Sequence, residues 1–365
     1  MPGDARLALP TGPGRVIRDV TALDALAEAW DALAAPAVCP MQQYAWARAC
    51  AATFTRRREL HVVAVNEAAG LAVAPLVRSR DAVGRVEFLG ALELDEPADV
   101  LAADTASLAL LAEALVRSGH PLLLKRLPAE SPLVPALLEA YRGRGFVVRR
   151  RLAGFPWIPL REDWTRPEER LNAGRRSDLR RARRIALAMG PLRFEMLAPS
   201  PAGLEPLLSE AFAVEGASWK GRAGTSLTSD PIRRTFFRHY AAAAAARGIL
   251  RLGFLRVGER AVAMQLGVEW SRRFWLLKIG FDEAFARCSP GTLLMLEMMR
   301  DAARRGLEAV ELLGVPEPWT RLWTRLEHPC VSLRAYPASR AGVAALGADL
   351  ASLGLRRFGR SRGAA

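Results

Sequence analysis

The pattern of apolar and polar positions predicts a series of short elements in the first half of the chain. Residues 16–20 alternate like a strand, and Thr21 stands where a helix N-cap is expected. Asn66 to Gly70 suits a hairpin turn between two of the β-rich runs. The predicted helices are 22–33, 42–54, 105–117 and 133–142, and the predicted strands are 16–20, 60–65, 71–77, 83–89, 122–127 and 146–152.

The second half repeats this order of two helices, three β-rich runs, a helix and a strand. Gly258-Glu259 and Ser271-Arg272-Arg273 separate the three runs as tight turns. The predicted helices are 167–189, 202–217, 231–246, 290–305 and a short one at 319–325, and the predicted strands are 192–196, 249–257, 261–270, 274–281, 309–313 and 331–336.

An order that occurs twice indicates two similar modules of the α+β class, each with a mixed and mostly antiparallel sheet flanked by helices. We expect an N-terminal module over residues 15–153 and a C-terminal module over residues 154–337. Residues 338–365 are expected to form a C-terminal helix and a basic tail. A single large irregular domain is the alternative.

The charge of the chain favours anionic partners. Among its 365 residues, 52 are basic and 38 acidic, which gives a net charge of +14. Arginine is abundant throughout, so its number alone identifies no partner. The four cysteines and four histidines are scattered without ligand spacing, so we expect a reduced, cytoplasmic protein without a metal. No run of about 18 apolar residues predicts a membrane span.

Phe274 to Gly314 is the most informative stretch. Ser289 can cap a helix, Pro290 fits its first position, and Gly291 lets a ligand approach the backbone. The first-turn N–H groups and the helix dipole would attract an anion, and Thr292 completes that turn. The apolar residues that follow predict a buried helix. Neither glycine-rich nucleotide-binding motif, GxGxxG or GxxxxGK[ST], is present.

This stretch resembles the CelD/BcsL-type acetyltransferases of the GNAT superfamily, which are related to the Fem peptidyltransferases. The similarity rests on an aromatic strand before Phe281-Asp282, then Pro290-Gly291, an apolar helix, Arg305-Gly306 and Leu313-Gly314. It extends to three further segments: Pro40–Trp46, Arg180–Arg184 with Gly190-Pro191-Leu192, and Ala217-Ser218-Trp219-Lys220-Gly221. Two positions depart from the family pattern. Glu311 replaces an aspartate, and Trp319-Thr320 replaces a tyrosine–lysine pair.

The resemblance implies two tandem GNAT-like folds and acetyl-coenzyme A, or another acyl-coenzyme A, as the donor. The phosphates would lie at Ser289, Pro290, Gly291 and Thr292. The backbone of Lys278, Ile279 and Gly280 would pair with the pantetheine arm and polarise the thioester carbonyl. The first module is expected to be degenerate, since Asp104 stands where an anion would bind.

Three carboxylates are candidates for the general base. Glu269 lies near the end of a predicted central strand, Asp282 follows the next strand, and Glu215 precedes the Trp-Lys-Gly segment. Asp282 also suits a turn residue and Glu215 a surface position. No tyrosine occurs in the helix after Gly291, so water or Cys288 would have to serve as the acid.

We expect the acceptor to be contacted by residues from several segments. Trp219 and Lys220 follow a helix, Trp319 replaces the family tyrosine, and Arg321 could stand in for the missing lysine. Arg180 and Arg184 share a helix face that reads as a solvated surface, a glycan or phosphate site, or an RNA contact.

The sequence therefore predicts an acyl-coenzyme A-dependent acyltransferase that uses direct attack in a ternary complex. The expected acceptor is an amine or hydroxyl of a small molecule or glycan, such as a sugar precursor in exopolysaccharide or cellulose production. Two alternatives remain open: an aminoacyl-tRNA-dependent transferase of the Fem type, and an inactive GNAT-like scaffold of a polysaccharide synthesis complex. There is no strong case for nucleic acid.

Overall fold

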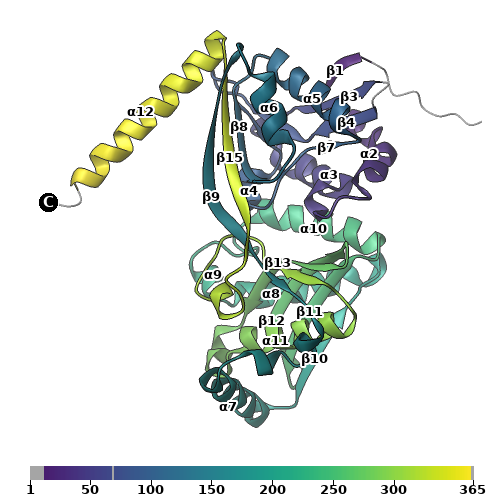
Figure 1. The fold of residues 1–365 in the computed structure, drawn as a ribbon. Coiled ribbons are helices and arrows are strands. Elements are labelled where there is room, and N and C mark those ends of the chain that lie inside the picture. Colours follow the sequence, from purple (N-terminus) through teal and green to yellow (C-terminus); the bar gives the residue numbers. More distant parts are fainter. Residues whose placement is uncertain (1–11, 68–69, 363–365) are drawn as a thin grey trace, which may run out of the picture. The chain divides into compact units, whose positions relative to one another are not determined.

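A computed structural model of the protein describes residues 12–67 and 70–362 (Figure 1). Contacts divide the chain into two compact units. Unit 1 contains residues 12–37, 41–152 and 329–362, and unit 2 contains residues 38–40 and 153–328. The chain therefore passes from unit 1 to unit 2 within β9 (Gly145–Pro159) and returns within β15 (Glu327–Pro337).

This division differs from the predicted one at the C-terminal side of unit 2. Residues 329–337 were expected in the second module, but β15 pairs with β8 (Leu122–Pro128), with Leu333 opposite Leu124. Val331, Leu333 and Ala335 lie in the core of unit 1 for this reason. At the boundary within β9, unit 2 begins at residue 153, and the predicted second module begins at residue 154. The division into two modules otherwise stays a prediction.

Unit 1 contains two sheets. One has the antiparallel order β1-β3-β4-β7. The other has the order β9-β15-β8-β6-β5-β2, to which β9 contributes its first part and in which β6 and β8 are parallel. The remaining strands of unit 1 are β1 (Gly12–Ile17), β2 (Arg58–Leu60), β3 (Val62–Glu67), β4 (Gly70–Ala74), β5 (Leu76–Ser79), β6 (Val86–Phe88) and β7 (Leu101–Ala102).

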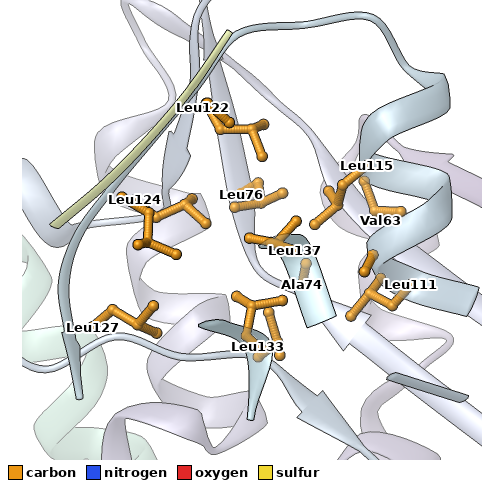
Figure 2. Packing of buried hydrophobic residues seen from close by; sticks show 14 of the residues in the cluster. Val63, Ala74, Leu76, Leu111, Leu115, Leu122, Leu124, Leu127, Leu133 and Leu137 are labelled. Atoms are coloured by element: carbon orange, nitrogen blue, oxygen red, sulfur yellow. The ribbon is translucent and has the colours of Figure 1, made fainter. Parts of the chain in front are cut away.

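The helices of unit 1 cover an aliphatic core. Figure 2 shows Leu111 and Leu115 packing with Leu133 and Leu137 against strand residues such as Leu76. The helices are α1 (Val20–Asp24), α2 (Ala27–Ala34), α3 (Tyr44–Phe54) after η1 (Pro40–Gln42), α4 (Ala91–Leu94), α5 (Thr105–Arg117), α6 (Leu133–Ala140) and α12 (Arg340–Arg362).

Several predicted elements of unit 1 are divided in the structure. The runs 60–65 and 71–77 each break, at His61 and Pro75, and their two parts join different sheets. The predicted helix 22–33 is two helices. Its first N-cap is Asp19, whose side chain accepts the Ala22 N–H at 2.7 Å, and Thr21 lies inside the helix.

Unit 2 has one sheet in the order β10-β11-β12-β13-β14-β9, with β13 and β14 parallel and the other pairs antiparallel. Its strands are β10 (Leu192–Leu197), β11 (Leu250–Val257), β12 (Arg260–Trp270), β13 (Arg273–Phe281), β14 (Ala309–Glu311) and the second part of β9. The helices are α7 (Ala173–Met189), α8 (Leu204–Gly216), α9 (Trp219–Arg222), α10 (Pro231–Ala246) and α11 (Pro290–Arg304), with 3-10 turns η2 (Glu162–Thr165), η3 (Pro167–Arg170), η4 (Pro201–Gly203), η5 (Glu283–Cys288) and η6 (Thr320–Leu322).

The helices of unit 2 lie on both faces of its sheet. Gly280 contacts Glu215 of α8, whereas its neighbour Phe281 contacts Gly291 of α11. Since successive strand residues point to opposite faces, α8 and α11 cover opposite faces. The predicted helix 167–189 begins at Ala173, where Asn172 caps it by accepting the Arg175 N–H. Both units are thus mixed sheets with flanking helices, and the predicted α+β class is confirmed.

Among the residues described, no helix combines the length and apolar composition needed to cross a membrane.

Candidate active site

The strands β13 and β14 separate soon after they begin to pair. Their parallel register covers only Arg273 to Trp275, opposite Ala309 to Glu311. β13 nevertheless continues to Phe281 and stays paired with β12 over its whole length, apart from a bulge near Leu277. Among the described strands, none pairs with the other edge of β13 beyond Trp275, so this stretch offers backbone groups to a ligand.

A cavity of about 410 Å³ lies along this open edge. We call it the β13 cavity. Apolar side chains form most of its wall, including Met264, Met295, Leu312 and Trp323. Its polar lining consists of few groups, as is usual for small-molecule sites. The lining includes residues that the sequence predicted to bind the donor or the acceptor: Trp219, Lys220, Ile279, Gly280, Gly291, Thr292 and Trp319.

The N-terminus of α11 opens on the β13 cavity. Pro290 is its first residue, as predicted, and Gly291 and Thr292 line the cavity. Ser289 occupies the N-cap position, but its backbone is left-handed (φ 45°) and its side chain makes no capping hydrogen bond. Pro290 has no N–H and the Thr292 N–H donates to Ser289 O at 3.0 Å, so within the described residues the Gly291 N–H is the first-turn donor left for an anion.

The matching helix start in unit 1 is closed. Asp104 caps α5 by accepting the Ser107 N–H at 2.7 Å, and Ser107 Oγ accepts the Asp104 N–H. These hydrogen bonds hold the pKa of Asp104 below its usual range, so the carboxylate stays charged. A carboxylate at this position excludes a phosphate from the α5 N-terminus, in contrast to α11.

The backbone of Ile279 faces the open edge of β13. The Asp282 N–H donates to Val262 O of β12, so even-numbered residues of this stretch face β12 and odd-numbered ones face the cavity. The Ile279 carbonyl confirms this direction, since it accepts a hydrogen bond from Lys220 Nζ at 2.8 Å. Of the three backbone positions predicted for the thioester, Ile279 is thus directed to the cavity, while Lys278 and Gly280 pair with β12.

Glu215 and Lys220 form an ion pair beside the cavity. Glu215 is fully buried, its Oε2 accepts the Leu227 N–H at 2.7 Å, and its Oε1 lies 3.8 Å from Lys220 Nζ. Burial lowers the pKa of Lys220, and the charges of Glu215 and then Glu317 oppose that shift. Lys220 lines the cavity and Glu215 does not, so the carboxylate acts on the site through the lysine.

Gln265 is a cavity residue that the sequence prediction missed. It is 1% exposed, and its Nε2 contacts Met295 Sδ at 2.9 Å. Its Oε1 has no hydrogen-bond partner among the described residues, which is costly for a buried polar atom unless a ligand supplies one. The signal in the sequence was a single polar residue inside the apolar run 261–268.

Two other predicted carboxylates lie elsewhere. Glu269 was expected to face the cleft, but it lies at the far end of β12, where Arg251 and Arg305 bind its two oxygens. Asp282 caps η5, accepting the Ala284 N–H and pairing with Arg260. Neither lines the β13 cavity, and both are engaged in ion pairs with arginines.

The predicted lysine and cysteine also point away from the cavity. Lys278 Nζ lies 5.0 Å from the centre of the Phe237 ring of α10. Cys288 is buried, its thiol donates to Phe285 O, and burial raises its pKa, which makes it a poor proton donor.

The predicted acceptor residues are divided among three places. Trp319 lines the β13 cavity, and its indole donates to Glu317 at 2.8 Å. Arg180 lines a separate cavity of about 370 Å³ between α7 and α11, and Arg184 is exposed on α7. Arg321 is exposed in η6, outside the β13 cavity. Within residues 12–67 and 70–362, no group of three or more His, Cys, Asp or Glu side chains is arranged to hold a metal ion.

Comparisons with known proteins agree with this geometry. A family model described as an acetyltransferase (GNAT) domain matches residues 173–321. No curated protein matches the chain.

Solved structures share the fold of most of the chain. The C-terminal domain (DUF2156) of a putative lysylphosphatidylglycerol synthetase from Agrobacterium fabrum is 13% identical, with a TM-score of 0.55 over 90% of this chain and 96% of that one. FemX is 12% identical, with a TM-score of 0.52 over 89% and 97%. L-PGS from Bacillus licheniformis is 11% identical, with a TM-score of 0.50 over 94% and 97%.

Identities this low establish a shared fold only. The family match concerns residues 173–321, which lie in unit 2. The chain is built of tandem GNAT-like sheets flanked by helices, and residues 173–321 form a GNAT-fold acyltransferase domain.

Proposed function

We propose that the protein transfers an acyl group from acyl-coenzyme A to an amine or hydroxyl of a small or glycan acceptor, within unit 2. The observation that supports this most directly is the β13 cavity, which joins an unpaired strand edge to the uncapped N-terminus of α11. An unpaired edge suits the amide-bearing pantetheine arm, and the helix N-terminus suits the pyrophosphate.

The residues present fit this donor. Gly291 and Thr292 would meet the pyrophosphate, and the odd-numbered backbone groups of β13 would pair with pantetheine. The capped α5 N-terminus supports the proposal that unit 1 is a degenerate module and that unit 2 binds the donor.

Acyl transfer requires a polarised carbonyl and an acceptor that loses its proton. The Ile279 N–H lies on the same side of β13 as its carbonyl and would donate to the thioester oxygen. The deprotonated form of Lys220 would accept the proton of the attacking amine or hydroxyl, and burial, which lowers the pKa of Lys220, increases the share of this form. The new bond to the carbonyl carbon forms as the carbon–sulfur bond breaks, and the coenzyme A thiolate takes a proton from solvent.

Direct attack is favoured over a covalent intermediate, because the buried Cys288 thiol is directed to the Phe285 carbonyl and has a raised pKa. The CelD/BcsL-type subfamily and a sugar acceptor in exopolysaccharide production remain proposals.

Calorimetric titration of acetyl-coenzyme A into the wild type, Gly291→Glu and Gly291→Ala tests the donor site. A Cβ at Gly291 would meet Phe281 at 3.4 Å, an ordinary contact, so alanine fits. Glutamate adds bulk and a negative charge where the pyrophosphate is expected. We predict micromolar binding to the wild type and Gly291→Ala and at least about a 100-fold loss in Gly291→Glu.

Equal binding by all three proteins would place the phosphates elsewhere, and no binding of any acyl-coenzyme A to the wild type would contradict the proposed donor. The second candidate is then an aminoacyl transfer of the Fem type, which the fold shared with FemX supports. Salt-sensitive binding of aminoacyl-tRNA would be its signature.

A further inference from the structure

A second cavity of unit 2 is lined by four arginines. It has a volume of about 550 Å³ and lies between the N-terminus of α7 and the segment around η6. We call it the arginine pocket. Arg170 and Arg175 line it from the α7 side, and Arg321 and Arg325 from the other. No carboxylate is among its lining residues.

Three of these four arginines lack a counter-charge. Arg170 pairs with Asp163 and stacks on Trp164. The side chains of Arg175, Arg321 and Arg325 make no ion pair or hydrogen bond within the described part of the chain, and all three are exposed. Like charges gathered in one concave site repel one another, and a bound anion relieves that repulsion.

Most arginines elsewhere in unit 2 are neutralised. Arg256 binds both Glu195 and Glu210, and Arg273 binds the buried Glu311. Exposed arginines such as Arg184 and Arg304 also make no ion pair within the described residues, so what distinguishes the arginine pocket is that three such arginines line one cavity.

A second comparison comes from α7 itself, which also lines the cavity between α7 and α11. Arg180 and Arg183 line it, but Glu168 and Glu297 line it too, and Glu297 lies 3.8 Å from Arg183. With Arg176 also in its lining, that cavity has three arginines against two glutamates, whereas the arginine pocket at the start of α7 has four arginines and no carboxylate. The positive end of the α7 dipole adds to its field, although Asn172 caps one of the N–H groups.

The arginine pocket adjoins the β13 cavity. Leu322 lines both, and Arg321 and Leu322 are neighbours in η6. An anionic group held by the arginines would thus belong to a ligand that also reaches the site of acyl transfer.

We propose that the arginine pocket binds a phosphate group of a substrate. Guanidinium groups bind phosphate oxygens in pairs, and four of them match a dianion better than a single carboxylate. The phosphate has two possible sources, the 3′-phosphate of coenzyme A and a phosphorylated acceptor. The anion site stands without the proposed function, while its part in acyl transfer rests on it.

Calorimetric titration of inorganic pyrophosphate into full-length Gly291→Glu, in which the proposed donor site at the α11 N-terminus is blocked, tests the site at low salt; the substitutions below are added to this variant. We expect Arg321→Ala/Arg325→Ala to weaken binding by at least about tenfold, since each lost charge-assisted contact costs roughly that much. Arg181→Ala/Arg304→Ala removes the same charge from exposed positions outside the pocket and should stay within about twofold. Arg321→Lys/Arg325→Lys keeps the charge without the paired donors and should fall between them.

Coenzyme A and 3′-dephospho-coenzyme A then distinguish the two sources. If the pocket takes the 3′-phosphate, the wild type binds coenzyme A more tightly, and the difference disappears in Arg321→Ala/Arg325→Ala. If it takes an acceptor phosphate, the two cofactors bind alike, and pyrophosphate still binds when coenzyme A is saturating.

Pyrophosphate binding that is equal in Gly291→Glu with and without Arg321→Ala/Arg325→Ala, both folded, would overturn the proposal. The titration contains no acyl donor, so failure of the proposed acyl transfer leaves its result unchanged.

Discussion

At the residue scale, the chemistry of the site depends on the pair of Glu215 and Lys220. The carboxylate is buried and the lysine reaches the cavity wall, so a charge that solvent cannot screen acts on a group that a substrate can touch. Lys220 also holds the Ile279 carbonyl, which links the proton acceptor to the strand that would polarise the thioester. A change at Lys220 therefore affects both functions.

The pH dependence of acyl transfer tests this pair. If neutral Lys220 accepts the proton, kcat/KM rises with pH through the pKa of Lys220. We predict that Lys220→Met removes this rise and lowers kcat by roughly 100-fold or more. Glu215→Gln should move the rise to lower pH, because the Glu215 charge raises the pKa of Lys220 and its loss lets that pKa fall further.

The matched control is Lys278→Met, which removes a lysine that lies over the Phe237 ring and does not line the β13 cavity, and it should keep the wild-type profile. A rise that shifts to higher pH in Glu215→Gln, or persists in Lys220→Met, would exclude Lys220 as the base.

The site residues that could be predicted from the sequence were those with a recognisable local motif. Lys220 was identified because its Trp-Lys-Gly segment resembles the family, and Gly291 because a glycine in the first helical turn lets a ligand approach the backbone. The prediction for Glu269 as a base rested on its position near a strand end, which is visible in the sequence. Its partners are not visible there, because Arg251 lies in β11 and Arg305 follows α11.

At the element scale, β13 and α8 approach closely enough that only glycine fits between them. A Cβ on Gly280 would lie 2.6 Å from Glu215 Cα and 3.0 Å from its Cβ. Gly280→Ala must therefore push α8 away from β13 and displace the Glu215–Lys220 pair. We predict a loss of about 1–3 kcal/mol in the free energy of unfolding and weaker acetyl-coenzyme A binding by the folded protein.

Gly267→Ala is the comparison for this prediction. Its Cβ would lie 2.6 Å from Trp275 O and 2.7 Å from the Phe274 ring, in the sheet but outside the cavity lining. Chemical denaturation and calorimetry should show that both variants are destabilised and that Gly280→Ala alone loses affinity. Full affinity in Gly280→Ala would mean that the packing of α8 does not position the site.

The elements of unit 2 were easier to predict than those of unit 1 because their turns are local. Ser271 and Arg272 both adopt positive φ, 50° and 57°, and join β12 to β13 directly. In unit 1, the break at Pro75 follows from the sheet that each half joins, with β4 pairing with β3 and β5 with β2. Such pairing depends on distant residues and leaves little trace in the local pattern.

At the scale of the whole molecule, each unit has its own hydrophobic core. One cluster in unit 1 includes Leu111 and Leu333, and two clusters in unit 2 are built around α11 with Phe274 and Leu255. The tandem arrangement was predicted because the order of elements repeats, but the return of β15 to unit 1 was not, since the sequence near Pro329 carries no sign of the strand it pairs with.

Separate cores predict two thermal unfolding transitions in the full chain. Acetyl-coenzyme A at about 100 times its Kd should raise the Tm of the unit 2 transition by roughly 5–10 °C and leave the other unchanged. Of the nine tryptophans, Trp30 and Trp46 lie in unit 1 and the others in unit 2, so tryptophan fluorescence should follow mainly the shifted transition. Differential scanning calorimetry that shows one transition, shifted as a whole, would contradict this prediction.

The placement of β15 affects how the protein is made on the ribosome. All of unit 2 after β9 has been synthesised by His328, but unit 1 receives Val331 and Leu333 only afterwards. At about 5–20 residues per second, unit 1 waits on the order of 10–35 s for its last strand. Until then β8 has an open edge that another nascent chain can pair with. The half of the protein whose synthesis starts first is thus the last to be completed, and the GNAT domain can fold before it.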